Sequence, residues 1–257
     1  MRILALGDVF GEAAVGYLET ALPRLLSFLR PELVIANAEN ASGSSGVEPL
    51  QAQRLFEAGC DVLTGGNHTF GRKAFSDYLE THENALRPAN YPAGTPGGGY
   101  TVCRAANGAR VLVVSLRGNL GFPVPLSCPF ETLERILARE AGHYDYSAVD
   151  FHAEYTSEKV AMGRAFDGRV SVLFGTHTHV PTADETVLPG GTGYITDLGM
   201  TGPVDGVLGV CSEIVVSAMK TKLPAHFETA KGEIRANGAL FTLSEEGRCL
   251  AAERISF

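Results

Sequence analysis

The stretch "RVSVLFGTHTH", residues 169–179, places two histidines one residue apart, directly after an apolar run. The apolar run is typical of a buried strand that ends at Gly175. In an extended chain, the spacing of His177 and His179 puts both rings on one side and Thr178 on the other. The pair is compatible with a surface turn, but it favours one half of a metal site.

The chain around this stretch alternates between strand and helix patterns. Besides residues 169–175, we expect strands at residues 2–7, 32–37, 61–66, 100–105, 110–116 and 147–153. Helical spacing predicts helices at residues 12–30 with a break near Pro23, and at residues 48–59, 72–80, 129–141 and 157–166. After residue 180 the chain is expected to be mainly β, ending in a hairpin around residues 244–248. These patterns predict a layered α/β protein, parallel early and mixed later, in a single domain of residues 1–257.

Composition narrows the class of protein. The 257 residues are 45% hydrophobic, enough for a sizeable core, and their formal net charge of −8 argues against binding a nucleic-acid polymer through a basic face. Five scattered cysteines without a C-x-x-C pair argue against a disulfide framework or a thiolate zinc site. The opening "MRILALGD" carries no signal-peptide pattern, and no apolar run approaches the ~20 residues of a membrane span. We therefore expect a soluble cytoplasmic protein.

Five of the expected strands end in polar clusters. The clusters are Asp8; Asn37, Glu39 and Asn40; Asn67 and His68; Asp150 and His152; and His177 and His179. Because ligands of open α/β sheets bind outside the carboxyl ends of the strands, these clusters are expected to meet at one edge. Carboxylates, carboxamides and histidines without thiolates suit manganese, iron, zinc or nickel better than copper(I) or calcium. The sequence therefore predicts a metal centre.

Each of these residues also has a purely structural interpretation. Asp8 and Asn67 stand where the N-caps of the following helices are expected, and Glu39 fits a plain turn. A lone His152 fits a hydrogen-bonded histidine at a strand end. These interpretations do not predict that all five clusters end strands, so the joint pattern favours metal binding.

The order of these clusters resembles the motifs of the calcineurin-like metallophosphoesterases. It consists of an aspartate, a second acid, G-N-H, a histidine and H-x-H. The segments "GDVFG", "NAEN", "GGNHTFG", "RPANYP", "DFHAE", "GTHTHVPTAD" and "DLGMTGP" are similar to the bacterial YmdB-type branch over most of the chain. The resemblance implies a four-layer α/β/β/α fold, a double β-sandwich of mixed sheets flanked by helices. It also implies two metal ions, one held by Asp8, Glu39, Asn40 and His179 and the other by Glu39, Asn67, His152 and His177.

Three positions depart from the wider superfamily. Phe10 stands where the first motif usually has a histidine, Glu39 replaces the usual bridging aspartate, and Thr69 follows G-N-H where many members carry an acid. The first two departures match the YmdB-type branch, in which the asparagine beside the glutamate replaces the missing histidine. The third leaves open which residue orients His68, which the resemblance places against the substrate rather than on a metal.

The resemblance implies a metal-dependent phosphodiesterase that hydrolyses small cyclic nucleotides, either 2′,3′-cyclic or cAMP-like. We expect metals roughly 3.5–4 Å apart that share a hydroxide, with this hydroxide attacking phosphorus and His68 acting as catalytic general acid. The ligand set allows two divalent or mixed-valence ions, iron or manganese, and also zinc. Phe10 and the loop "ASGSSG", residues 41–46, are the expected pocket residues.

Two alternative functions stay open from the sequence. One is a phosphomonoesterase or nucleotidase, because the same metals can open a monoester. The other is a nucleotide-sensing regulatory protein with slow turnover. The expected partner is a small phosphodiester, with no nucleic-acid polymer and no membrane, and the resemblance alone suggests a homo-oligomer.

Overall fold

The strand β1 (Arg2–Leu6) shows why the chain forms two facing sheets. In the computed structural model, which describes residues 1–43 and 45–257, β1 is buried from Ile3 onward. Leu4 and Leu6 point into one apolar core, whereas Ile3 and Ala5 point into another. Because successive side chains of a strand alternate between faces, β1 belongs to a sheet that is covered on both sides.

The first sheet has five strands in the order β14-β13-β1-β3-β4. Its other members are β3 (Leu33–Asn37), β4 (Val62–Thr64), β13 (Asn237–Leu243) and β14 (Cys249–Ser256). The strands β1, β3 and β4 run parallel, while β13 is antiparallel to both of its neighbours. The carboxyl ends of the three parallel strands therefore lie at one edge.

The second sheet has six strands in the order β5-β6-β7-β8-β10-β9. Its members are β5 (Tyr100–Arg104), β6 (Arg110–Arg117), β7 (Tyr146–His152), β8 (Val172–Thr176), β9 (Thr186–Val187) and β10 (Gly193–Ile195). Four of them, β6, β7, β8 and β10, are parallel, and an antiparallel strand closes each side. A third, small sheet joins β2 (Asp8–Val9), β11 (Met200–Pro203) and β12 (Ile234–Arg235).

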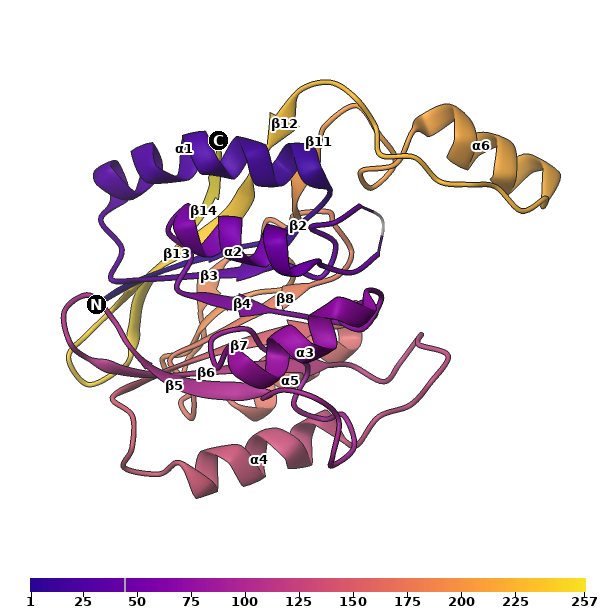
Figure 1. The fold of residues 1–257 in the computed structure, drawn as a ribbon. Helices are drawn as coiled ribbons and strands as arrows, with labels where there is room; N and C mark the ends of the chain where they lie inside the picture. The colour runs from indigo at the N-terminus through magenta and orange to yellow at the C-terminus, as the bar shows by residue number, and fades with distance from the viewer. Residues whose placement is uncertain (44) are drawn as a thin grey trace.

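Helices cover the outer faces of the two large sheets (Figure 1). The first sheet carries α1 (Glu12–Leu29), α2 (Pro49–Glu57) and α3 (Lys73–Thr81), and the second carries α4 (Pro129–Arg139) and α5 (Thr156–Ala165). A core of side chains such as Ile35 and Phe174 fills the space between the sheets. The three separate cores confirm the expected α/β/β/α layers and mixed sheets.

The expected break in the first helix is wrong. The helix α1 continues without interruption through Pro23 to Leu29. Proline removes one backbone hydrogen bond and crowds the preceding turn. Pro23 is exposed, however, so water can solvate the carbonyl group that loses its partner.

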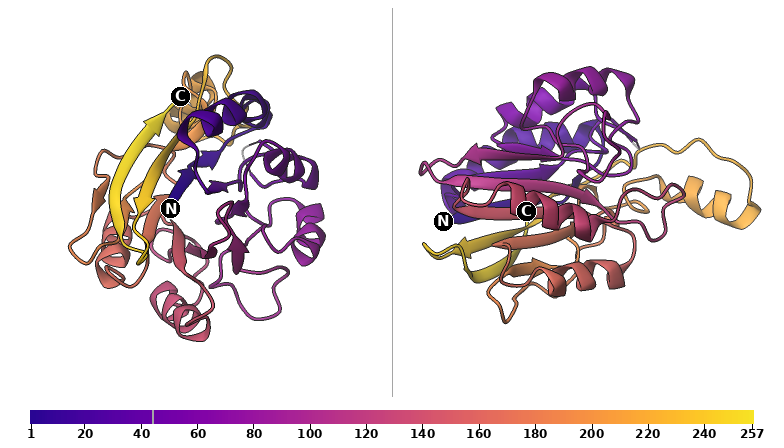
Figure 2. Two further views of the ribbon diagram at one scale, coloured as in Figure 1. Left: turned by 90° about the vertical axis from the view of Figure 1, so that its left-hand side faces the viewer. Right: turned by 90° about the horizontal axis from the view of Figure 1, so that it is seen from below.

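A sixth helix, α6 (Ser212–Thr221), lies in the region that was expected to be mainly β. It projects away from the rest of the molecule in two perpendicular views (Figures 1 and 2). Ile214, Val215 and Ala218 follow helical spacing, a signal that the expectation of a mainly β region missed. The other expected strands and helices are all present, including the final hairpin between β13 and β14. In the part of the chain that the structure describes, no helix has the length and apolarity needed to span a membrane.

Candidate metal centre

The polar clusters at the strand ends meet, as expected, at one edge of the two large sheets. Asp8 lies in β2 of the small sheet. In the first large sheet, Glu39 and Asn40 follow β3, and Asn67 and His68 follow β4. In the second large sheet, His152 ends β7, and His177 and His179 follow β8. The two sheets approach each other very closely around Gly66. A Cβ atom there would lie 2.3 Å from both Glu39 Oε2 and the His152 ring, so the glycine of "GGNH" is required for the two sheets to share this site.

His152 lies at the centre of one group of potential ligands. Its Nε2 atom is 2.9 Å from Asn67 Oδ1, 3.0 Å from His177 Nδ1 and 3.1 Å from Glu39 Oε1. A ring nitrogen carries one proton at most, so it cannot satisfy three acceptors at once. Four donor atoms therefore converge on one point, and His152 and Glu39 are almost fully buried. This arrangement is typical of a cation site.

Each of the three histidines among the candidate ligands has one ring nitrogen held from outside. Nδ1 of His152 is 2.9 Å from Thr176 Oγ1, Nε2 of His177 is 2.8 Å from a Glu154 carboxylate oxygen, and Nδ1 of His179 is 3.0 Å from the Leu208 carbonyl oxygen. If the outer nitrogen donates its proton to these oxygens, the inner nitrogen presents its lone pair to the centre. Outer partners of this kind fix the tautomer of metal-binding histidines.

The second group of potential ligands consists of Asp8, Asn40 and His179. His179 Nε2 is 3.4 Å from Asn40 Nδ2 and 3.8 Å from Asp8 Oδ1, and Glu39 Oε1 is 3.4 Å from Asn40 Nδ2. Two oxygens here, Asp8 Oδ1 and Asn40 Oδ1, are buried without a hydrogen-bond partner among the described residues. Buried polar atoms are normally paired, and a cation would satisfy both. The residues present therefore fit metal ions, with Glu39 between the two groups.

Burial and the neighbouring charges shift the pKa values of these groups strongly. Burial raises the pKa of Asp8 to about 6. Burial alone would also raise the pKa of Glu39, but His152 together with His68 lowers it to about 2. At His152, burial alone would lower the pKa, but Glu39 together with Asp8 and Asp150 raises it to about 9. Burial, followed by the charge of His152, lowers the pKa of His177 to about 3. Without metal, the site therefore retains a proton on His152 to offset the buried carboxylates.

The two histidines of "GTHTH" do not lie in extended chain, which corrects the expectation from their spacing. His177 has φ 102° and His179 has φ 65°, both in the left-handed region that L residues rarely adopt. Such backbone costs about 1–3 kcal/mol per residue and persists only where the surroundings impose it. Both rings still face the centre, because the chain turns immediately after β8.

Asp197, the first residue of "DLGMTGP", holds this turn from behind. One carboxylate oxygen accepts hydrogen bonds from the Thr178 amide at 3.2 Å and hydroxyl at 2.8 Å, and the other accepts one from the Gly199 amide at 2.8 Å. Lys159 from α5 completes the set, with Nζ 2.6 Å from Asp197 Oδ2 and both side chains only 1% exposed. This buried ion pair was not found from the sequence, because α5 and the turn are brought together only by the fold.

Behind His152 lies a second buried network. Asp150 Oδ1 accepts from Thr176 Oγ1 at 2.7 Å, and Asp150 Oδ2 accepts from Asn37 Nδ2 at 3.0 Å and from the Thr64 hydroxyl. Asn37 and Asp150 belonged to the strand-end clusters in the sequence without an assigned role. They lie beneath the ligands and fix the position of the Thr176 hydroxyl that contacts His152.

The sequence left open which residue orients His68, and in the structure Ser45 contacts its ring. Its Oγ atom is 3.2 Å from His68 Nδ1, whereas the hydroxyl of Thr69 turns back to the Gly66 backbone at 2.9 Å. The His68 amide donates to Glu39 Oε2 at 3.0 Å. Ser45 belongs to the loop "ASGSSG" that was expected to line the pocket, although Ser44 of this loop lies outside the described residues.

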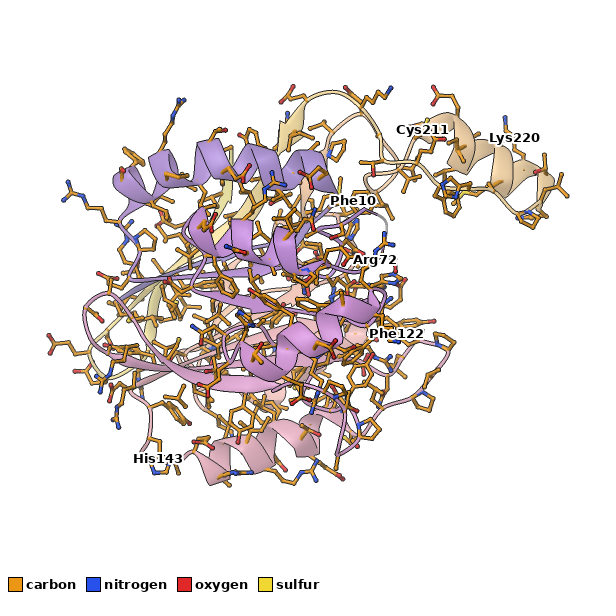
Figure 3. The ribbon with its side chains drawn as sticks, viewed as in Figure 1. Phe10, Arg72, Phe122, His143, Cys211 and Lys220 are labelled. Carbon is orange, nitrogen blue, oxygen red and sulfur yellow. The ribbon has the colours of Figure 1, made fainter. Side chains whose placement is uncertain are left out.

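A cavity of about 360 Å³ opens over the ligands. Its lining consists of Phe10, Glu39, Asn40, His68, Glu154, His177, Thr178, His179, Val180 and Leu208. Phe10, an expected pocket residue, contacts the His179 ring edge-on at 5.4 Å and forms one wall of the cavity. Outside this lining, the Phe122 ring lies 5.0 Å from the His177 ring, on the same side of the molecule as Phe10 (Figure 3). Glu154, Leu208 and Phe122 were not predicted, because no local pattern distinguishes them.

Comparison with known proteins gives consistent matches over the whole chain. A family model described as YmdB-like protein matches residues 4–255. The 2′,3′-cyclic-nucleotide 2′-phosphodiesterase of Bacillus subtilis (strain 168) is 41% identical, over 99% of this chain and 96% of that protein. A crystal structure of a hypothetical protein from Thermus thermophilus has a TM-score of 0.93 and 39% identity, covering 100% of this chain and 99% of that one. A crystal structure of a novel phosphatase from Mycoplasma pneumoniae has a TM-score of 0.93 and 34% identity, covering 100% and 93%.

Proposed function

The chain belongs to the YmdB-like protein family, and from this premise we propose that it hydrolyses small cyclic phosphodiesters such as 2′,3′-cyclic nucleotides. Its relatives are named as a phosphodiesterase and a phosphatase, so it is a hydrolytic enzyme. The choice of a diester rests on the charge of the 360 Å³ cavity over the candidate ligands. Apart from histidines, the charged residues that line this cavity are the acids Glu39 and Glu154.

The donor set supports two metal ions at the base of this cavity. Asp8, Glu39, Asn40 and His179 would hold one ion, and Glu39, Asn67, His152 and His177 would hold the other. When bound, two such ions supply positive charge for the phosphoryl oxygens and lower the pKa of water. Iron, manganese and zinc all suit these nitrogen and oxygen donors.

His68 is the residue proposed to protonate the departing oxygen. It lines the cavity without belonging to either ligand group, and Ser45 Oγ lies 3.2 Å from its Nδ1. With Nδ1 engaged in this contact, Nε2 is left to hold a proton for the substrate. The oxygen that leaves a nucleoside cyclic phosphate is a ribose alkoxide, a poor leaving group that needs this proton.

The cavity favours a diester over a monoester on electrostatic grounds. Within the described chain, its lining has no Lys or Arg, and the Glu154 side chain at its mouth is 52% exposed. A phosphodiester carries one negative charge near neutrality, whereas a phosphate monoester has a second pKa of about 6 and carries nearly two. The second charge would meet Glu154 without a protein cation to offset it.

The test compares turnover of bis(p-nitrophenyl) phosphate, p-nitrophenyl phosphate and 2′,3′-cyclic AMP by enzyme whose metal content has been measured. We expect kcat/KM for the two diesters to exceed that for the monoester by about tenfold or more, which corresponds to roughly 1.4 kcal/mol. Preference for the monoester would overturn the proposal.

Glu154→Gln is a matched variant for this test. The glutamine retains an oxygen that can accept from His177 Nε2 but removes the negative charge. The preference for diester over monoester should therefore narrow by several-fold while metal content stays unchanged. An unchanged preference would show that Glu154 does not contribute to the discrimination.

A further inference from the structure

A second cavity, of about 470 Å³, lies beside α4 on the outer side of the second sheet. Its lining consists of Arg87, Ala89, Tyr91, Pro92, Ala93, Gly99, Tyr100, Ser127, Thr132, Arg135, Ile136 and Arg139. It shares no lining residue with the cavity over the metal centre. Its volume is within the range of small-molecule sites, about 300–1,000 Å³.

The charge of this second cavity is opposite to that of the whole protein. The chain has a net charge of −8, yet the charged residues among the lining are three arginines and no acid. Arg139 is 3.7 Å from Glu140, which partly neutralises it. Within the described residues, Arg87 and Arg135 have no carboxylate oxygen within 4.0 Å, so two guanidinium groups have no anionic partner from the protein.

Arg87 carries an unused donor. Its Nε is buried and has no acceptor among the described residues, while its Nη1 donates to the Pro88 carbonyl at 2.9 Å. Burial lowers the pKa of this guanidinium by more than the nearby Glu80 raises it, so the charge of Glu80 does not offset the cost of burying the group. A buried donor without an acceptor costs about 1–3 kcal/mol, and an oxyanion would remove this cost.

The other groups at the cavity are held in place. Arg135 Nη2 donates to Thr132 Oγ1 at 3.1 Å, and that hydroxyl donates to the Cys128 carbonyl at 2.8 Å. On the opposite side, the loop that carries Arg87 is fixed by Asn90, whose Nδ2 donates to the carbonyl groups of Arg117 at 2.7 Å and Ser127 at 3.1 Å. Asn90 thereby holds the "RPANYP" segment in place, and no residue of this segment belongs to the proposed metal ligands.

We propose that this cavity is a binding site for a small molecule that carries a diphosphate group. Guanidinium groups bind phosphate oxygens in bidentate pairs, and two unpaired arginines with a third nearby match two linked phosphates. The acidic surface of the remaining protein disfavours a longer polyanion. Free pyrophosphate and the diphosphate of a nucleotide share this chemistry, and the two can be separated by experiment.

Isothermal titration calorimetry with inorganic pyrophosphate and with ADP tests the proposal on the full chain. We compare Arg135→Gln, Arg87→Gln and the double variant with Arg24→Gln, an exposed arginine of α1 that removes the same charge elsewhere. Arg135 is also exposed, so its replacement is not expected to impair folding. Repeating the titrations in a Glu39→Ala chain, which lacks the residue proposed to hold both metal ions, removes the contribution of the metal centre.

The wild type and Arg24→Gln should bind one pyrophosphate per chain at this site, and this binding should persist in the Glu39→Ala background. Each cavity variant should weaken this binding by about tenfold or more, as expected for loss of a hydrogen bond to a charged group. Tighter binding of ADP than of pyrophosphate would identify a nucleotide as the ligand, and equal binding would identify the diphosphate alone. Equal affinity in the double variant and Arg24→Gln, or no binding by the wild type, would overturn the proposal.

Discussion

The buried wall of the metal centre and its open rim are held in place by different means. We call His152 and the turn 177–179, with Asp150, Lys159 and Asp197 behind them, the buried wall, and His68, Ser45 and Glu154 the open rim. His152 and Asp150 are 0% exposed, and Lys159 and Asp197 are 1% exposed. The Glu154 side chain, by contrast, is 52% exposed, and Ser45 comes from a loop.

The two regions differ in how many contacts fix each group. Asp197 accepts four hydrogen bonds, and Asp150 accepts three from three different strands or strand ends. Among the described residues, the His68 ring has one hydrogen-bond partner, Ser45. From this difference we infer that the wall would position the proposed metal ligands and contribute to stability, whereas the rim would act on substrate with little effect on stability.

Removing the charge that compensates Asp197 should have the largest effect. Lys159→Met leaves the Asp197 carboxylate buried without its cation, and we expect a loss of about 3–5 kcal/mol in the free energy of unfolding. Metal content should fall as well, because the strained turn at His177 loses its support. Urea unfolding and elemental analysis measure the two effects. Lys73→Met, on the exposed surface of α3, is the control and should stay within about 0.5 kcal/mol of wild type. Equal stability of the two variants would contradict the distinction between wall and rim.

His68→Ala tests the rim. Loss of a general acid should lower kcat by about 10²–10⁴-fold while metal content stays the same as in the wild type. Steady-state kinetics and elemental analysis on the same preparation measure this directly. His143→Ala is the matched control, because this side chain is 70% exposed and lies far from Phe10 and Phe122 (Figure 3). Metal loss in His68→Ala would move His68 from the rim to the ligand set.

Ser45→Ala should have the smallest effect of the three. It removes the hydroxyl 3.2 Å from His68 Nδ1, and loss of one neutral hydrogen bond corresponds to a two- to about tenfold decrease in kcat. Ser45→Thr keeps a hydroxyl and should restore most of the rate, and Ser217→Ala on exposed α6 should have no effect. Wild-type kcat in Ser45→Ala would show that another group orients His68.

The candidate ligands were found from the sequence because each one ends or follows a strand. Asp8, Asn40, Asn67, His152 and His179 all stand next to apolar runs whose periodicity is local and visible. Parallel strands bring their carboxyl ends to one edge, so finding the strands was enough to predict that these residues meet. Their roles as metal ligands stay predictions, and elemental analysis is the direct test.

Contacts between distant segments were not predictable in this way. Lys159 and Asp197 are 38 residues apart, and nothing in their local sequence links them. Local spacing also predicted the wrong backbone for His177 and His179, since an i, i+2 pair places both rings on one side only if the chain is extended. The contact of Ser45 with His68 and the three arginines beside α4 were missed for the same reason.

The sequence by itself determined the layers of the fold, the edge at which the candidate site forms and the chemical types of its candidate ligands. These depend on the alternation of apolar residues along each strand and on which polar residue follows it. The tertiary structure alone decided how the histidines are oriented, what supports the left-handed turn and where unpaired arginines gather. Those features depend on distances between side chains of different elements, which exist only after the two sheets have packed against each other.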